Sequence, residues 1–461
     1  MGDTSVSAGP LALGIAELGQ AFRSGTLSPV EVVEALFDEI ARDSRDINAF
    51  CHLDCNAAIA AARASGERHR AGSALGPLDG IPVSIKDLVN VAGWPTRRGS
   101  LACAGEPDAA ADSPAVAHLR AAGAVIFGKT TTTEFGWTVI SDSPHSGRTR
   151  NPLDPSRSAG GSSCGAAAQL AAGWGPLALG SDAGGSVRIP ASYCGVVGFK
   201  PTFGAIPLAP QSAFAEFAHL GPMTRNVQDC MLAMQVLAQP DVRDPSSLFP
   251  RADALPARPL RLGWTTRLGG NEAPAPQIEA AFRQLLQRLE QAGYQLQELA
   301  LDGEHLSADM WQVWCSRVFE SFEAWPSERR ALLDAPLQRA YAEGEAQAAS
   351  GLARSRAALR GFSGRIADAY RNVDLILTPT TPTTAPLFEQ PGTGDAQHVD
   401  WFGTGAYTYP FNLTQLPALS LPLGRGEDGM PFGVQIAGRK YQDDGVLAFG
   451  AELERLLGKQ K

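Results

Sequence analysis

The chain has 461 residues, of which 44% are hydrophobic and 19% are charged, so it can build a large apolar core and lacks the composition of a disordered protein. Its formal net charge of −9 argues against a binding surface for nucleic acid or for an anionic membrane, since such surfaces gather lysine and arginine. The sequence contains no apolar run long enough for a membrane helix and no basic leader, which predicts a cytoplasmic protein with no membrane partner.

The first 70 residues indicate a helical region that packs on a catalytic domain spanning residues 71–461, the two forming one compact unit. Ser28 is the expected N-cap of a helix that has Pro29 at its first position, and residues 11–69 as a whole have a helical pattern. The seven cysteines suit reduced thiols. Cys51 and Cys55 flank a histidine, but no second ligand pair follows at zinc-site spacing, so we expect no metal.

Further along the chain, helices alternate with short apolar runs. Residues 114–123 are expected to form a helix and residues 124–129 a strand, a pattern typical of an α/β fold. Residues 157–201 are rich in Gly, Ser and Ala, yet an apolar strand there runs directly into a glycine turn, which indicates the packed centre of the molecule and not a linker.

The second half of the chain continues this alternation. Residues 258–264 and 294–301 are predicted strands around a helix whose buried face comprises Ile278, Phe282, Leu285, Leu286 and Leu289. Residues 311–370 are expected to be largely helical and polar. Strand-like runs at 373–383, 416–424 and 432–438 are expected to rejoin the main sheet.

Three separate features have the residue types of a catalytic site: Lys86 in GIPVSIKDLV, the loop AGGSSCGA at 159–166, and the turn SDAGGSVRIP at 181–190. A lysine after an apolar run can simply extend to the surface, whereas a buried lysine has a lowered pKa and can act as a base. Consecutive glycines allow close approach of the backbone to a substrate. The amides of Ala183, Gly184, Gly185 and Ser186 can therefore converge on one oxygen as an oxyanion hole.

In type, order and spacing, these three features closely resemble the amidase signature family. The similarity extends from GIPVSIKD through LRAAGAVIFGKTTTTEF to GGSSCGAAAQLAAGWGPLALGSDAGGSVRIPASYCGVVGFKPT. It implies a single α/β domain in which helices cover both faces of a large mixed central β-sheet. No cofactor is implied.

The resemblance also implies a Ser–Ser–Lys triad. Ser186 would attack the carbonyl carbon to form an acyl-enzyme, while Ser162 passes its proton to neutral Lys86. In the family the relay serine lies 24 positions before the nucleophile, which selects Ser162 over Ser163. Family members hold this serine after a cis peptide bond, which here would be Gly161–Ser162.

Supporting roles are expected for neighbouring residues. Asp182 and Arg188 flank the nucleophile turn and can brace it, or can form an ordinary structural pair. Ser163 can hydrogen-bond Lys86 or the relay serine. The family usually has glycine where this chain has Cys164, which leaves the loop conformation open, and no histidine neighbours Cys164 in sequence to make it the nucleophile.

Two rival interpretations have to be weighed. Residues 123–130, GAVIFGKT, match the P-loop pattern, but a helix precedes the first glycine and the four intervening residues are themselves an apolar strand. A Ser–His–Asp triad would require a G-x-S-x-G elbow, which the sequence lacks. Neither nucleotide binding nor a catalytic histidine is therefore expected.

The substrate is less well determined. In the tRNA-linked amidotransferase subunit of the family, an acidic residue binds the amino group of glutamine at a position that resembles Gly405 here, which favours a free-standing hydrolase. Amidotransferase and non-catalytic binding subunits with a vestigial triad are the alternatives. The expected partner is a small amide or carbamate, and the protein is expected to be a monomer or homodimer.

Apolar residues near the expected cleft point to aryl amides, anilides, carbamates (urethanes) and esters as substrates. The substrate-binding candidates are Trp137, Gly161, Phe214, Phe217, His219 and Tyr409, and Ala218, Trp401, Phe402 and Tyr407 are further lining candidates. His219 is equally compatible with a packed core position.

Overall fold

The computed structural model describes residues 9–247, 255–256, 259–270, 273–301, 303, 306–389 and 401–458. Within them, one mixed sheet of 11 strands runs through the molecule in the order β1-β3-β2-β6-β8-β7-β12-β13-β11-β9-β10. The strands are β1 (Phe50–Leu53), β2 (Pro82–Lys86), β3 (Val125–Thr130), β6 (Leu177–Asp182), β7 (Val197–Lys200), β8 (His219–Thr224), β9 (Arg261–Trp264), β10 (Gln295–Glu298), β11 (Leu375–Pro379), β12 (Ala418–Arg425) and β13 (Pro431–Ala437). The hairpin of β4 (Arg150–Asn151) and β5 (Asp154–Ser158) stands apart.

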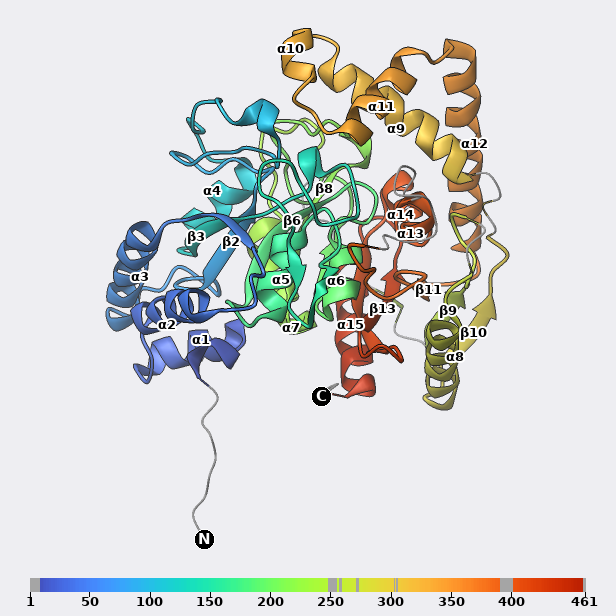
Figure 1. The fold of residues 1–461 in the computed structure, drawn as a ribbon. Helices are drawn as coiled ribbons and strands as arrows, with labels where there is room; N and C mark the ends of the chain where they lie inside the picture. The colour runs from blue at the N-terminus through green and yellow to red at the C-terminus, as the bar shows by residue number, and fades with distance from the viewer. Residues whose placement is uncertain are drawn as a thin grey trace.

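Helices flank this sheet, as Figure 1 shows. In chain order they are α1 (Ile15–Ser24), α2 (Pro29–Arg42), α3 (Cys55–Arg70), α4 (Pro114–Ala121), α5 (Cys164–Ala171), α6 (Arg188–Cys194), α7 (Val227–Leu237), α8 (Pro276–Gln291), α9 (Leu306–Phe322), α10 (Ser327–Arg330), α11 (Ala335–Glu345), α12 (Ala349–Ala369), α13 (Trp401–Thr404), α14 (Tyr409–Leu413) and α15 (Asp443–Leu457). Short 3-10 turns are η1 (Pro10–Ala12), η2 (Leu101–Cys103), η3 (Glu134–Gly136) and η4 (Ala215–Phe217). The predicted α/β fold with a large mixed sheet is confirmed.

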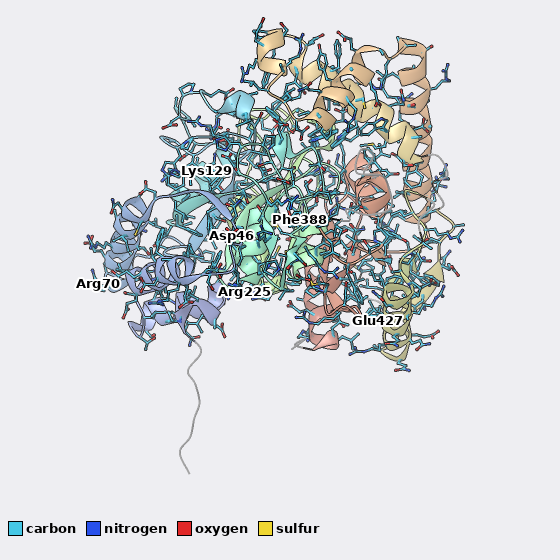
Figure 2. All side chains as sticks on the ribbon, viewed as in Figure 1. Asp46, Arg70, Lys129, Arg225, Phe388 and Glu427 are labelled. Carbon is cyan, nitrogen blue, oxygen red and sulfur yellow. The ribbon has the colours of Figure 1, made fainter. Side chains whose placement is uncertain are left out.

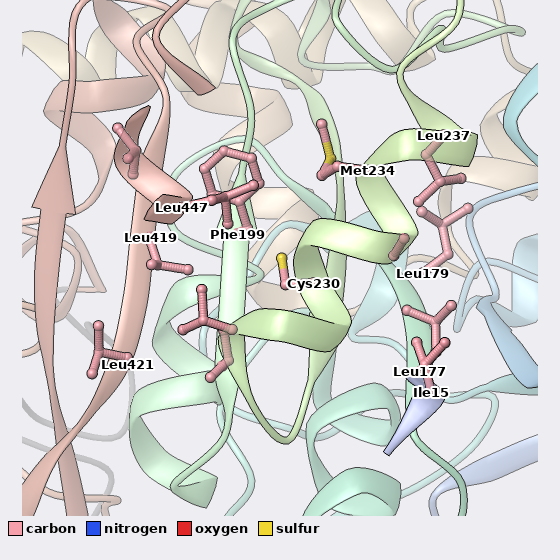
Figure 3. Packing of buried hydrophobic residues seen from close by; sticks show 14 of the residues in the cluster. Ile15, Leu177, Leu179, Phe199, Cys230, Met234, Leu237, Leu419, Leu421 and Leu447 are labelled. Atoms are coloured by element: carbon pink, nitrogen blue, oxygen red, sulfur yellow. The ribbon is translucent and has the colours of Figure 1, made fainter. Parts of the chain in front are cut away.

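Side chains of β6 alternate between the two faces of the sheet because successive residues of a strand point in opposite directions. Leu177 and Leu179 pack in the cluster that contains α7, whereas Ala178 packs in the cluster that contains α5. Figure 3 shows the first of these layers, where α7 lies over the strands and α15 contributes Leu447. This strand at the centre of the sheet is therefore buried on both faces.

The N-terminal helices are joined to this core by packing and by hydrogen bonds. Ile15 on α1 is 1% exposed within the cluster around α7. Arg225, labelled in Figure 2, donates to the carbonyl groups of Leu11 (2.5 Å) and Leu13 (2.6 Å). Ser28 caps α2 as predicted, since its hydroxyl accepts a hydrogen bond from the amide of Glu31.

Two expectations about the elements need correction. Residues 11–69 are not all helical, because β1 separates α2 from α3 and pairs antiparallel with β3 at the edge of the sheet. The segment 311–370 is helical, in α9 to α12, but α9 is not a polar helix: Met310, Val313 and Trp314 are at most 2% exposed. The late strand-like runs do rejoin the sheet as β11, β12 and β13. No helix in the described ranges has the length and apolar character of a bilayer span.

Candidate active site

The site lies at the carboxyl ends of two neighbouring parallel strands. Lys86 is the last residue of β2 and Asp182 the last residue of β6, and Ile85 is paired with Leu179 in the register of the two strands. Parallel strands end at the same edge of a sheet, so the chain that leaves β6 passes beside Lys86. The turn that follows, residues 183–187, carries Ser186 and leads into α6.

Lys86 is completely buried and is surrounded by hydroxyl and carbonyl groups. Its Nζ lies 2.7 Å from Ser162 Oγ, 2.9 Å from Ser163 Oγ and 3.3 Å from the carbonyl oxygen of Ser181. Burial lowers the pKa of Lys86 to about 7, since the charged ammonium is poorly solvated there. A lysine with this pKa is substantially neutral at physiological pH and can accept a proton.

The hydrogen-bond pattern distinguishes the two serines. Ser163 Oγ donates to the carbonyl of Ser181 (3.1 Å), so it can only accept from Lys86. A neutral Nζ has two protons, which it can donate to Ser163 Oγ and to the carbonyl of Ser181. In the neutral amine the lone pair of Lys86 can accept the hydroxyl proton of Ser162, the relay direction that the family resemblance implies.

The loop that carries Ser162 is packed closely on its surroundings. The Gly161–Ser162 peptide bond is cis, as expected. A Cβ on Gly161 would lie 2.5 Å from the carbonyl oxygen of Thr138, so Gly161 lets the backbone approach and offers no side chain to a substrate. The amide of Ser163 donates to the carbonyl of Ser186 (3.0 Å), which joins this loop to the nucleophile turn.

Cys164, the departure from the family pattern, is the first residue of α5 and needs no unusual backbone. It is 1% exposed, and its thiol donates to the carbonyl of Thr131 (3.4 Å). Burial raises the pKa of Cys164 and so favours the thiol over the thiolate. This environment does not suit a nucleophile.

Asp182 and Arg188 brace the nucleophile turn as one buried unit. Arg188 donates to both carboxylate oxygens of Asp182, at 2.9 Å from Nε and 2.8 Å from Nη2, and both side chains are fully buried. Burial alone would raise the pKa of Asp182, but the charge of Arg188 holds it well below its ordinary value. Asp182 therefore remains ionised and accepts further hydrogen bonds from the turn.

Those hydrogen bonds change the expected set of oxyanion donors. The amide of Gly185 donates to Asp182 Oδ1 (2.8 Å) and that of Val187 to Oδ2 (3.1 Å). Gly185 is therefore removed from the predicted donors, because its amide is already used to hold the turn. Within the described part of the chain, the amides of Ala183, Gly184 and Ser186 have no hydrogen-bond partner. Ser186 itself is 9% exposed.

Aromatic side chains gather beside this turn in what we call the aromatic cluster: Trp137, Phe214, Phe217, Trp314, Phe402 and Tyr409, which belong to the same packed group as Ala183. A Cβ on Gly184 would lie 3.9 Å from Tyr409 Cβ and 4.0 Å from Trp314 Cη2, so these two residues border the turn. Phe214 stacks on Trp314 with ring centroids 3.9 Å apart.

The remaining lining candidates divide into two groups. Ala218 and Tyr407 belong to the same packed group as the aromatic cluster. The side chain of Trp401 lies outside the described part of the structure. The sequence did not identify Trp314, because it lies in a segment whose composition suggested a polar helix; its stacking on Phe214 and its approach to Gly184 show its place in the structure.

His219 is a buried residue of the central sheet. It lies on β8 opposite Asp182, is 3% exposed, and its Nδ1 is 2.8 Å from the carbonyl oxygen of Phe217. Burial lowers its pKa well below the ordinary histidine value, so the ring is neutral. The carbonyl of Phe217 also accepts from Asn412 Nδ2 (3.1 Å), which fixes the end of η4.

The P-loop-like segment has no phosphate-binding geometry. Residues Val125–Thr130 form β3, so Gly128 and Lys129 lie within a strand and not in a loop. Lys129, labelled in Figure 2, is fully buried and pairs with Asp87 at 2.8 Å. Its Nζ also donates to Thr96 Oγ1 (2.6 Å) and to the carbonyl of Pro95 (2.7 Å), which leaves no free donor for a nucleotide.

Comparison with known proteins agrees with this geometry. A family model described as Amidase matches residues 31–447. The chain is 34% identical to an acylamidase of Rhodococcus erythropolis, covering 96% of this chain and 95% of that one, and 34% identical to a glutamyl-tRNA(Gln) amidotransferase subunit of Chloroflexus aggregans, covering 95% and 94%. The crystal structure of a bacterial aryl acylamidase superposes with a TM-score of 0.88 at 26% identity, covering 96% of each chain.

Proposed function

Because this chain belongs to the amidase signature family of amide-hydrolysing enzymes, we propose that it is a free-standing serine hydrolase whose Ser186, Ser162 and Lys86 cleave the C–N bond of apolar or aryl amides and carbamates. The observation that carries the proposal is the buried Lys86, which is held 2.7 Å from Ser162 with its pKa lowered to about 7 by burial. Esters would be cleaved by the same steps.

In this mechanism Ser186 Oγ attacks the carbonyl carbon, its proton passes to Ser162, and the proton of Ser162 passes to Lys86 Nζ. The oxygen of the tetrahedral intermediate accepts hydrogen bonds from amides of the turn. When the C–N bond breaks, the proton returns from Lys86 through Ser162 to the departing nitrogen. Water then attacks the acyl-enzyme by the same relay and releases the acid and Ser186.

A substrate panel tests the triad assignment. Purified protein should hydrolyse an anilide and an alkyl carbamate, and a fluorophosphonate should label Ser186. Ser186→Ala should abolish both turnover and labelling, whereas Ser363→Ala on α12, whose hydroxyl only donates to the carbonyl of Leu359, should leave both unchanged. An unlabelled wild-type protein would instead support a binding subunit with a vestigial triad.

Preference for apolar substrates rests on the aromatic cluster beside the turn. Trp314→Leu removes the ring on which Phe214 stacks. It should lower kcat/KM for an anilide by about 10-fold, and it should change kcat/KM for a small aliphatic amide by less than about 2-fold. Trp264→Leu is the control, since Trp264 packs on Phe282 of α8. A wild-type preference for a dicarboxylic monoamide over the anilide would contradict the assignment.

Gly405 supports a free-standing hydrolase over an amidotransferase subunit. It has no side chain to bind the amino group of glutamine, and its carbonyl lies 3.0 Å from Thr408 Oγ1. The measurement is ammonia release from glutamine compared with release from the anilide panel. Glutamine turnover that exceeds all other amides would favour the amidotransferase alternative.

A further inference from the structure

The nucleophile turn is fixed through its peptide groups, and almost every one of them has an identified partner. The carbonyl of Gly185 accepts from the amide of Ile189 (2.7 Å), and that of Ser186 accepts from the amide of Ser163 (3.0 Å). Asp182 holds the amides of Gly185 and Val187. In a trans peptide the carbonyl and the following amide point in opposite directions, so anchoring a carbonyl also aims the next amide.

The carbonyl of Gly184 is the one anchored from far away in the sequence. Its partner is Thr408 Oγ1, at 2.7 Å, on a residue that is completely buried directly before α14. The same hydroxyl lies 3.0 Å from the carbonyl oxygen of Gly405, so its single proton is shared between two acceptors, of which Gly184 is the nearer. The contact leaves no free space, since a Cβ on Gly185 would lie 2.2 Å from Thr408 Oγ1. Thr408 is held in turn, because Arg188 Nη1 donates to its backbone carbonyl (2.8 Å).

Together these contacts clamp the Gly184–Gly185 peptide group from both sides. Thr408 donates to its carbonyl and Asp182 accepts from its amide, so the group cannot rotate without breaking two buried hydrogen bonds. The amide of Gly184 belongs to the preceding peptide group and that of Ser186 to the following one, so fixing the Gly184–Gly185 group limits both amides through the backbone torsions at Gly184 and Gly185. Neither amide has a hydrogen-bond partner in the described part of the chain.

We propose that Thr408 is a positioning residue for the oxyanion hole: its hydroxyl locks the Gly184–Gly185 peptide group, so that the amides of Gly184 and Ser186 converge on the oxygen that develops charge. This inference rests on the proposed function, because it assumes that Ser186 is the nucleophile. Thr408 itself touches no substrate. Its effect appears in the tetrahedral state, where preorganised donors contribute most.

Two substitutions separate the hydroxyl from the volume of the side chain. Thr408→Val keeps the shape, removes the donor and leaves the Gly184 carbonyl without a partner, whereas Thr408→Ser keeps the hydroxyl. Loss of one direct oxyanion donor lowers kcat by about 100- to 1000-fold, so an indirect anchor should lower it by about 10- to 100-fold. KM for the anilide should change by less than about 3-fold, because the planar substrate makes weaker use of these amides.

The diagnostic readout is the inhibition constant of phenylboronic acid, which we expect to form a tetrahedral adduct with Ser186. Thr408→Val should weaken this inhibitor by a factor similar to the fall in kcat, and Thr408→Ser should restore most of both. The matched control is Thr414→Val, since the hydroxyl of Thr414 donates to the carbonyl of Pro410 (2.8 Å) on the same segment and has no contact with the turn. It should retain wild-type kcat and inhibition.

The outcomes distinguish the inference from the function on which it rests. If Ser186→Ala is inactive and Thr408→Val keeps the wild-type kcat and boronate affinity, the positioning role of Thr408 is overturned and the proposed function stands. If Thr408→Ser loses as much as Thr408→Val, the hydroxyl is not the active group and the positioning role is again overturned. Hydrolysis by Ser186→Ala would overturn the proposed function itself.

Discussion

Lys86 is fully buried, and the contacts of its amine are hydroxyl and carbonyl groups with no carboxylate among the hydrogen-bonded partners. An ammonium in this position lacks both solvation and a direct counter-ion, which is why its pKa falls to about 7. Lys129 is buried as deeply but pairs with Asp87. The carboxylate beside the amine therefore distinguishes Lys129 from Lys86.

This difference leads to a prediction about pH. Below its pKa Lys86 is protonated and cannot accept the proton of Ser162, so kcat/KM should rise as the pH increases through about 7 and then level off. The rate for the anilide between about pH 5 and about pH 9 measures this limb. Lys86→Arg, whose guanidinium stays protonated throughout, should lower kcat by at least about 100-fold and remove the limb.

An acidic optimum, or an equally active Lys86→Arg variant, would contradict the base assignment. His219 does not offer another source for this limb. Its pKa lies well below the ordinary value because it is buried, so it does not titrate near neutrality.

The residues of the site differ in how far the sequence alone could identify them. Lys86, Ser162 and Ser186 each lie in a local motif, and their spacing could be compared with a family pattern. Thr408 and Trp314 carry no such local signal. They reach the nucleophile turn only through the folding of segments more than a hundred residues away, which no periodicity or turn pattern describes.

Among the elements, α15 shows how closely helices pack on the sheet. Gly450 on α15 faces β12, and a Cβ placed on it would lie 2.2 Å from Leu419 Cδ2. Leu419 is completely buried and cannot move aside without disturbing its neighbours. Gly361 on α12, in contrast, is exposed and has open space around it.

The same substitution at these two glycines should therefore have opposite effects. Gly450→Ala overpacks the contact with β12 and should lower the free energy of unfolding by about 1 to 3 kcal/mol. Gly361→Ala replaces a poor helix former in an exposed helix and should raise it by about 0.5 to 1 kcal/mol. Urea unfolding followed by circular dichroism measures both values, and a stabilising Gly450→Ala would show that the contact is loose.

Element prediction from the sequence succeeded where a pattern was long. The buried face of α8 was predicted residue by residue, and each of its five apolar side chains is at most 6% exposed. It failed for β1, which has only four residues and gains its structure from pairing with β3 at the sheet edge. It also failed for the polarity of α9, because that helix buries its apolar side chains within a segment of charged composition.

On the scale of the whole molecule, the site depends on the fold being complete. Arg188 alone joins Asp182, Thr408, Asn412 and Gln435, through hydrogen bonds of 2.7 to 2.9 Å. These residues come from β6, the region of α14 and β13. Both halves of the sheet are therefore needed to shape one turn.

The prediction at this scale is that the site and the fold are lost together. Labelling of Ser186 by a fluorophosphonate should disappear at the same urea concentration at which circular dichroism records global unfolding, because no local unit holds the turn by itself. Labelling that fails at clearly lower urea would mean that the turn unravels before the sheet. The Thr414→Val variant is the control, and its two transitions should also coincide.

The long-range anchoring of the Gly184 carbonyl also has a consequence for how the protein is made. During translation, Lys86, Ser162 and Ser186 leave the ribosome long before Thr408 and Asn412 are joined to the chain. The reactive residues thus exist first without the scaffold that orients them. We expect a chain whose synthesis stops between residues 190 and 400 to carry Lys86, Ser162 and Ser186 and still lack hydrolytic activity, because the residues that hold the turn are missing.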